Sequence, residues 1–287
     1  MTPSAKSLIL DLLSTLPPRH PVPVGALVRA GAIFGLGENS LRVALARLRA
    51  RGLVESDERG LYRLGAAAHA VNQQVRSWRT VEDAVCPWDG SWVAVEPGEL
   101  LRGDRAAVRR REGALRLLGF RAWAGRLALR PNNLLGGVEA ARERLDALGV
   151  GPRALVFRLS ELDAVAEGAA RALWHARALE AGYEAMRARL ETSAARLPTL
   201  SRKARMAESF RLGGEAVRQI VLDPLLPAPI VAAEKRGALV EAMRRYDRLG
   251  RRMWRGWAGD SIELEQSPGD TSGLAAAGAT PAAAQPA

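Results

Sequence analysis

The chain has 287 residues, of which 48% are hydrophobic and 25% charged, which is typical of a globular protein built from two or three compact units. Its 42 Lys and Arg outnumber its 31 Asp and Glu, and the formal net charge of +11 favours a polyanionic partner such as nucleic acid. One cysteine, Cys86, excludes an internal disulfide, and three scattered histidines give no zinc-ligand spacing, so we expect no metal and no cofactor. Because the chain has no long apolar run and no secretory pattern, we expect a cytoplasmic protein that has no membrane partner.

Residues 1–65 are predicted to form the first unit. The pattern reads as a helix, a proline-rich turn, a short helix, a turn at GLG (35–37), a longer helix and two short strands. Residues 1–78 contain ten basic and five acidic side chains, the highest charge excess for its size along the chain. This order of elements is typical of a winged helix-turn-helix DNA-binding domain, whose second helix enters the major groove.

The longer helix lies in ENSLRVALARLRARG (38–52). At roughly 100° per residue, its apolar side chains gather on one stripe that we expect to be buried. That stripe consists of Leu41, Ala44, Leu45 and Leu48. The opposite face carries small or apolar residues flanked by arginines, namely Arg42, Val43, Ala46, Arg47 and Ala50. A narrow ridge of this kind can approach a groove closely while its arginines reach base edges or phosphates.

The candidate DNA contacts on this helix are therefore Asn39, Ser40, Arg42, Val43 and Arg47. Two simpler interpretations compete with this one. The arginine stems could cover a solvated helix face, and Asn39 or Ser40 could serve only as the helix N-cap. The preceding short helix and the following strands favour DNA binding.

The candidate wing is GLVESDERGLYRLG (52–65). It predicts strands at Leu53–Glu55 and Leu61–Arg63 around a polar turn that ends at Gly60. Arg59 lies at the tip of that turn, where we expect it to contact a phosphate.

Beyond the first unit, residues 66–86 are predicted to form a helical connector, and residues 87–165 a central domain. The central pattern runs strand, helix, strand, strand, helix, strand, which is the β-α-β-β-α-β order of a ferredoxin-like domain. Residues 166–262 are predicted to be helical, with breaks at LPTL (197–200) and DPLLPAP (223–229). Residues 263–287 are poor in large apolar side chains and are expected to be disordered. The predicted fold class is therefore α+β and multidomain.

Three other segments admit two interpretations each. Trp88 and Trp92 in WDGSW (88–92) could line a site for an aromatic ligand, but we favour packing in the core. The segment RRYDRLGRRMWRGW (244–257) could bind phosphates of a CoA ester or a membrane surface, but we favour a solvated last helix whose tryptophans cap the core. Glu96 ends the first central strand and could serve a metal-dependent nuclease, although no motif places a second carboxylate beside it.

The chain resembles the PaaX-like transcriptional regulators, the phenylacetic acid degradation repressors and their relatives. The resemblance rests on GLGENSLRVALARLRARGLV followed by LYRL, on WDGSW with the strand WVAV, and on DPLLP (223–227), and it covers about residues 5–255. It implies a GntR-like winged-helix domain, a central ferredoxin-like domain similar to a small CRISPR-adaptation nuclease, and a helical C-terminal domain.

What the resemblance implies for function is a sequence-specific repressor rather than an enzyme. Family members are dimers that bind double-stranded operator DNA and leave it when an aryl-acyl-CoA such as phenylacetyl-CoA binds. The resemblance places DNA contacts at Asn39, Ser40, Arg42, Val43 and Arg47. It assigns no residue to effector binding.

Overall fold

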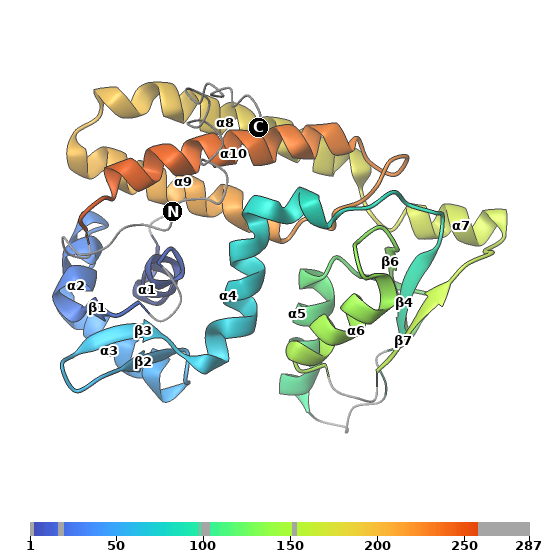
Figure 1. Cartoon of the computed structure of the whole chain (residues 1–287), viewed down its shortest axis with the longest axis horizontal. Coiled ribbons are helices and arrows are strands. Elements are labelled where there is room, and N and C mark those ends of the chain that lie inside the picture. Colours follow the sequence, from blue (N-terminus) through green and yellow to red (C-terminus); the bar gives the residue numbers. More distant parts are fainter. Residues whose placement is uncertain (1–2, 17–19, 97, 99–103, 151–153, 258–287) are drawn as a thin grey trace, which may run out of the picture.

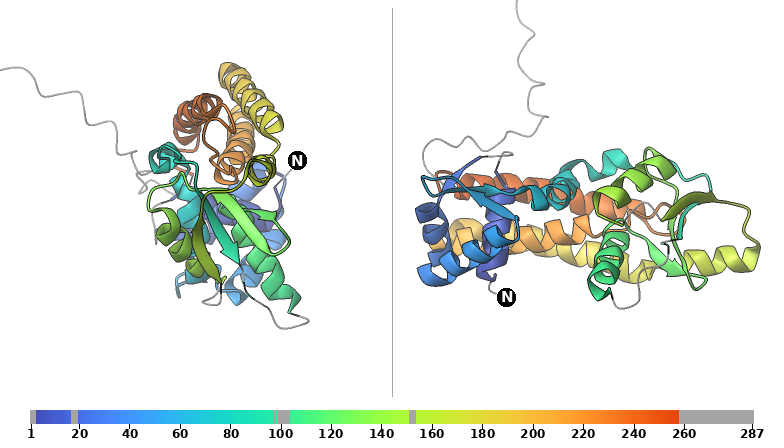
Figure 2. Two further views of the ribbon diagram at one scale, coloured as in Figure 1. Left: turned by 90° about the vertical axis from the view of Figure 1, so that its right-hand side faces the viewer. Right: turned by 90° about the horizontal axis from the view of Figure 1, so that it is seen from below.

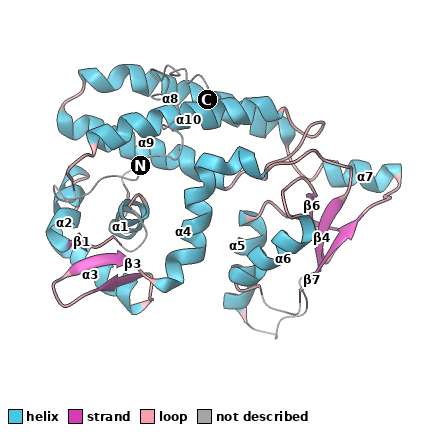
Figure 3. Cartoon of the chain, in the orientation of Figure 1, coloured by secondary structure: helices cyan, strands magenta, loops and turns pink. Residues whose placement is uncertain are grey.

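The computed structural model describes residues 3–16, 20–96, 98, 104–150 and 154–257. Over these residues the architecture is mixed α/β, with two small antiparallel sheets and long helices (Figures 1 and 3). The N-terminal unit (α1 to β3) and the central unit (β4 to β7) lie at opposite ends of the long helices (Figures 1 and 2). The tail 263–287, which we expected to be disordered, lies outside the described residues.

The N-terminal unit consists of α1 (Ala5–Ser14), β1 (Val22–Pro23), α2 (Val24–Ile33), α3 (Glu38–Ala50), β2 (Val54–Ser56) and β3 (Leu61–Leu64). The predicted order of helices and strands is found, with one addition. Strand β1 lies where the sequence predicted only a proline-rich turn, and it pairs with β3 through Val22 and Tyr62 to give the sheet order β1-β3-β2. Pro23 is tolerated because β1 is an edge strand, where a missing N–H breaks no inner ladder.

The connector comprises a 3-10 turn η1 (Ala66–Ala68), α4 (His69–Arg76) and a 3-10 segment η2 (Ser77–Ala84). It runs between the N-terminal unit and the central unit (Figure 1). Two ion pairs fasten η2 to helix α10 (Ala233–Met253). Arg236 Nε lies 2.9 Å from Glu82 Oε1, and Arg79 Nη2 lies 2.8 Å from Asp247 Oδ2.

The central unit contains β4 (Trp92–Glu96), α5 (Arg105–Leu117), β5 (Arg121–Trp123), β6 (Leu127–Pro131), α6 (Gly137–Ala147) and β7 (Leu155–Leu159), the element order that the sequence predicted. Its sheet order is β5-β6-β4-β7, and every neighbouring pair is antiparallel. Side chains alternate between the two faces of a strand, so one face packs against α5 and α6. The small core on that face includes Val93, Val95, Val156, Leu118 and Leu145.

The C-terminal part begins with α7 (Ala164–Arg171), followed by α8 (Ala176–Arg196), a 3-10 turn (Leu197–Thr199), α9 (Arg202–Val221) and α10. The two predicted helix breaks are therefore found, at the 3-10 turn and between α9 and α10. The core of these helices is continuous with Trp92, Ala94 and Leu129 on the second face of the central sheet. In the described part of the chain, no helix is both long enough and apolar enough to cross a membrane.

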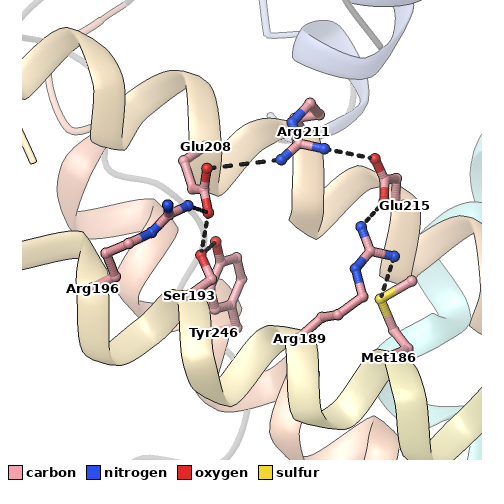
Figure 4. Close-up of polar contacts among 8 residues, drawn as sticks. All are labelled: Met186, Arg189, Ser193, Arg196, Glu208, Arg211, Glu215 and Tyr246. Carbon is pink, nitrogen blue, oxygen red and sulfur yellow. Dashed lines mark hydrogen bonds and ion pairs between the residues drawn. The ribbon is translucent and has the colours of Figure 1, made fainter.

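A row of polar contacts holds α8, α9 and α10 together (Figure 4). The Ser193 hydroxyl lies 2.8 Å from that of Tyr246 and donates to Glu208 at 2.9 Å. Glu208 also accepts from Arg196 at 2.6 Å, so one carboxylate links α9 to two positions on α8. Further along α9, Glu215 pairs with Arg211 and with Arg189 of α8. The three arginines of this row, Arg189, Arg196 and Arg211, are therefore paired with carboxylates of the protein itself.

Candidate nucleic-acid interface

Helices α2 and α3 meet through a close contact at one glycine. A Cβ atom on Gly31 would lie 2.3 Å from Leu41 Cδ1, so a larger residue there would require the buried Leu41 side chain to shift. The turn between the helices closes with the Leu36 N–H donating to the Gly31 carbonyl at 3.0 Å, while Gly35 adopts φ +74°. A left-handed residue of this kind commonly ends a helix and is usually glycine. The turn thus fixes the angle at which α3 leaves α2.

Burial along α3 follows the predicted stripe. Leu41, Leu45 and Leu48 are at most 1% exposed, and Ala44 is half-buried. The predicted outer face is exposed at each of its members, Arg42, Val43, Ala46, Arg47 and Ala50. Helix α3 lies at the end of the N-terminal unit remote from the long helices (Figure 1). No neighbouring unit in the described part of the chain covers its outer face.

The start of α3 corrects one interpretation from the sequence. The helix begins at Glu38 with Gly37 as its N-cap, so neither Asn39 nor Ser40 is the capping residue. Gly37 adopts an extended conformation (φ −72°, ψ 152°), which glycine can supply at an N-cap without a side-chain oxygen. Asn39 and Ser40 lie exposed in the first turn. Within the described residues their side chains form no intramolecular hydrogen bond, so they are accessible to a ligand.

The arginines of this face differ in their surroundings. Arg42 Nη2 lies 2.6 Å from Glu38 Oε1, four residues earlier, with 58% and 54% of the two side chains exposed. This pair follows the i,i+4 spacing that stabilises a helix, and that spacing is visible in the sequence. Arg47 is exposed, and the described residues include no carboxylate that pairs with it. Arg49 instead donates to the Ser56 hydroxyl at 3.3 Å, which joins α3 to the hairpin.

The hairpin β2–β3 begins and ends one residue later than predicted, with strands Val54–Ser56 and Leu61–Leu64. Its turn is held by Asp57, whose carboxylate accepts the backbone N–H groups of Arg59 and Leu61 at 3.0 and 2.9 Å. Arg59 is exposed at the tip, as predicted. Across the strands, the Arg63 guanidinium donates to Glu55 and holds the pKa of that carboxyl below its ordinary value. Of the two exposed arginines of the hairpin, Arg63 is paired with Glu55, and Arg59 has no carboxylate partner among the described residues.

The N-terminal unit is joined to the long helices by an aromatic contact. Phe34, directly after α2, lies 5.2 Å from the ring of Phe210 on α9 and 6.3 Å from that of Trp254. Trp254 is 7% exposed, and its indole N–H donates to the Met206 carbonyl at 3.0 Å. In the basic segment 244–257, Trp254 therefore caps a core, as the favoured interpretation held.

The other two sequence candidates are accounted for by contacts inside the protein. Trp92 is fully buried, stacks on Trp174 at 6.1 Å and meets the edge of Trp88 at 5.3 Å, so the aromatic pair of WDGSW packs in the core. Glu96 Oε1 lies 3.0 Å from Arg126 Nη2. Among the described residues, no group of three or more His, Cys, Asp or Glu side chains is placed to hold a metal ion.

Comparison with known proteins adds to this geometry. No curated protein matches the chain at a significant level. The solved structure titled "Uncharacterized protein Rv0674 from Mycobacterium tuberculosis" is similar to this chain at 20% identity, with a TM-score of 0.54 over 87% of this chain and 98% of that one. At this identity the likeness concerns the fold alone.

The family comparison concerns the unit that carries the exposed arginine face. The family model described as "PaaX-like protein" matches residues 4–68, a range that includes α1, α2, α3 and the hairpin. The resemblance seen in the sequence is thus confirmed over this range, which carries the candidate interface.

Proposed function

We propose that this chain is a sequence-specific DNA-binding transcriptional regulator that reads double-stranded DNA through the outer face of α3. The observation that carries the proposal is the exposure of Arg42, Val43 and Arg47 on a helix whose other side is fully buried. A major groove accepts one α-helix, and small central side chains with flanking arginines suit close approach to base edges. The PaaX-like match over residues 4–68 supports a regulatory rather than a catalytic protein.

In this proposal the chain is divided as the sequence suggested. Residues 1–65 form a winged helix-turn-helix domain, with α3 as the recognition helix and the β2–β3 hairpin as the wing. Residues 66–86 form the connector, residues 87–165 a ferredoxin-like domain and residues 166–262 a helical domain. The sheet order β5-β6-β4-β7 supports the ferredoxin-like assignment, because it interleaves the two β-α-β halves.

The DNA contacts fall into two classes. Asn39, Ser40, Arg42 and Val43 in the first turns of α3 face base edges, where sequence is read. Arg47, further along the helix, and Arg59 at the tip of the wing reach phosphates, which position the protein without reading sequence. Arg42 must exchange Glu38 for DNA when it binds, because the two side chains are paired in the free protein.

We further propose that the protein acts as a homodimer. A two-fold assembly matches paired operator half-sites, and a dimer needs a self-complementary surface. The edge strand β7 offers apolar side chains for this purpose, since Leu155 is 63% exposed and Phe157 is 37% exposed. We propose an acyl-CoA, such as phenylacetyl-CoA, as the effector that releases the operator, as the resemblance to PaaX-like regulators implies.

The proposal is tested by a mobility-shift titration on the DNA that flanks the protein's own gene, with and without aryl- and alkyl-acyl-CoAs. We expect a specific complex that Arg42→Ala weakens by roughly 1–3 kcal/mol, with relaxed preference at one base pair. Arg109→Ala, which removes an exposed arginine of α5, is the matched control and leaves the affinity unchanged. Equal affinity of Arg42→Ala and the parent at physiological salt would contradict this docking of α3.

A further inference from the structure

A cavity of about 300 Å³ lies where the connector, the central unit and the end of α9 meet. Its walls come from η2, from β6 and the ends of α5 and α6, and from the segment that follows α9. This volume is at the lower end of the range of ligand sites in proteins. Most of the lining is apolar and includes Trp78, Val81, Leu118, Leu134, Val221 and Leu225.

One wall of the cavity holds a buried cation that has no acidic partner among the residues that the structure describes. The Arg130 side chain, on β6, belongs to a residue that is 5% exposed. Its guanidinium donates only to backbone carbonyls: to Leu118 at 2.6 Å, to Pro131 at 3.3 Å and to Pro224 at 3.5 Å. Burial, and then the charge of Arg144, lower the pKa of Arg130 to about 9, so the group remains charged at neutral pH.

Among the described residues, the other buried arginine is Arg236, and its surroundings differ from those of Arg130. Arg236 is 1% exposed, and its guanidinium meets Glu82 with two nitrogens, at 2.9 and 3.2 Å. Although burial alone lowers its pKa, the hydrogen bonds and charge of Glu82 raise the pKa of Arg236 above the ordinary value. Removing a charge from water is costly unless an opposite charge accompanies it. Arg130 lacks the anion that Arg236 has.

A second arginine increases the positive potential at the cavity. Arg144 on α6 lines the same space, and its residue is exposed, which places it at the mouth. The one carboxylate in the lining, Asp223, is already engaged, because it accepts from the Tyr183 hydroxyl at 2.6 Å and from the Leu225 N–H at 2.8 Å. The lining therefore combines an apolar body with two cations and no free anion.

We propose that this cavity binds a small organic carboxylate, with its charge between Arg130 and Arg144 and its apolar body against Trp78 and the neighbouring aliphatic side chains. A planar guanidinium fork matches a carboxylate bidentately, and two forks can share its two oxygens. The apolar remainder gains from burial at roughly 25 cal/mol per Å² of surface. A volume of about 300 Å³ accommodates a small acid of this kind.

The position of the site couples it to the N-terminal unit. Trp78 and Val81 in its wall belong to η2, and Arg76, directly before η2, donates to the Leu16 carbonyl of the N-terminal unit at 2.7 Å. A ligand that packs against η2 therefore biases the placement of α3. This regulatory consequence depends on the proposed DNA-binding function, whereas the binding site itself does not.

The binding test uses isothermal titration calorimetry on the full chain with acetate, hexanoate, benzoate and 3-phenylpropionate. Hexanamide and benzamide serve as neutral counterparts, and inorganic phosphate and CoA as other anions. We expect one carboxylate per chain, with affinity rising with the apolar body and at least about tenfold weaker binding of the matched amide, since a charge-assisted hydrogen bond is lost.

Three variants locate the site. Arg130→Met, which keeps the bulk and removes the charge, and Arg144→Gln, which alters an exposed residue, should each weaken carboxylate binding at least about tenfold. Arg116→Gln removes an exposed arginine of α5 outside the cavity lining and should bind like the parent. If Arg130→Met fails to fold, Arg144→Gln still decides the question.

The proposal is overturned if no acid of the panel binds, if the amides bind as well as the acids, or if Arg144→Gln binds like the parent. Binding of phosphate or CoA without any carboxylate overturns it as well, because the ligand class is then wrong. Carboxylate binding with no effect on the affinity for DNA leaves the site standing and contradicts only the regulatory consequence. A chain that binds carboxylate but no DNA contradicts the proposed function alone.

Discussion

Helices α3 and α10 are both rich in arginine, yet their arginines have opposite roles. On α10, Arg236 and Arg244 point back into the protein and contact Glu82 and the Arg79 carbonyl. On α3, Arg47 is exposed without a carboxylate partner among the described residues, and Arg42 has only a neighbour on its own helix. The arginines of α10 therefore connect separate segments of the chain, whereas those of α3 are accessible to another molecule.

The number of arginines in a helix therefore does not identify a binding surface. Arginine has a long apolar stem and five donors, so the same side chain can either bind acceptors inside the protein or extend into solvent. What separates the two cases is whether an acidic or carbonyl acceptor lies within reach. Substitutions at Arg236, Arg59 and Glu38 test this difference between arginines that bind acceptors inside the protein and arginines that are exposed.

The largest effect is expected where an arginine fastens the connector to α10. Arg236→Ala leaves Glu82 and the Leu226 carbonyl without their partner, and we expect a loss of roughly 3 kcal/mol in the free energy of unfolding. This is the lower end for a buried pair, because the Glu82 side chain is 30% exposed. Chemical denaturation followed by circular dichroism measures the loss.

The control for this variant is Arg245→Ala on the same helix. The Arg245 side chain is 53% exposed and lies 3.7 Å from Glu241, so its removal should change the free energy of unfolding by no more than about 0.5 kcal/mol. An equal free energy of unfolding for the two variants would show that the buried Arg236 contributes no more to stability than the exposed Arg245.

An intermediate effect is expected at the tip of the hairpin. Arg59→Ala removes one proposed phosphate contact, so affinity should fall for all DNA sequences alike. The slope of the logarithm of the binding constant against the logarithm of salt concentration should decrease by about one unit. Fluorescence anisotropy at several salt concentrations gives this slope, and an unaltered slope would mean that the wing does not reach the backbone.

The smallest effect is expected at the acid that accompanies Arg42. Glu38→Gln frees the Arg42 guanidinium and removes a negative charge from the proposed interface, so DNA affinity should increase by roughly 0.3–1 kcal/mol, most clearly at low salt. The same titration on operator and on unrelated duplex measures it. Weaker binding of this variant would show that the pair positions Arg42 for DNA instead of competing with it.

The sequence predicted the outer face of α3 well because helical periodicity is a local property. The spacing of Leu41, Leu45 and Leu48 placed the buried side, and the exposed arginines followed from it. The N-cap was not predicted, because Gly37 caps the helix by backbone conformation alone. Strand β1 was missed because it has only two residues and is defined by its pairing with Leu61 and Tyr62 of β3.

The cavity beside Arg130 could not have been predicted from sequence. Two of the guanidinium's three acceptors, the carbonyls of Leu118 and Pro224, lie 12 and 94 residues away. Every residue has a backbone carbonyl, so no sequence motif predicts an arginine that is buried against carbonyl groups. The close approach of Gly119 to Pro224, where a Cβ would lie 2.9 Å from the proline Cα, is likewise visible only in the fold.

The ring of Phe34 sits directly after α2 and is held between Phe210 and Trp254. This aromatic contact packs the N-terminal unit (α1 to β3) against α9 and the residue that follows α10. In the proposed dimer, the distance between the two α3 helices would then depend on how the long helices of the two subunits lie relative to each other. Operators whose half-sites are one or two base pairs too close or too far apart should then bind more weakly than the correctly spaced operator.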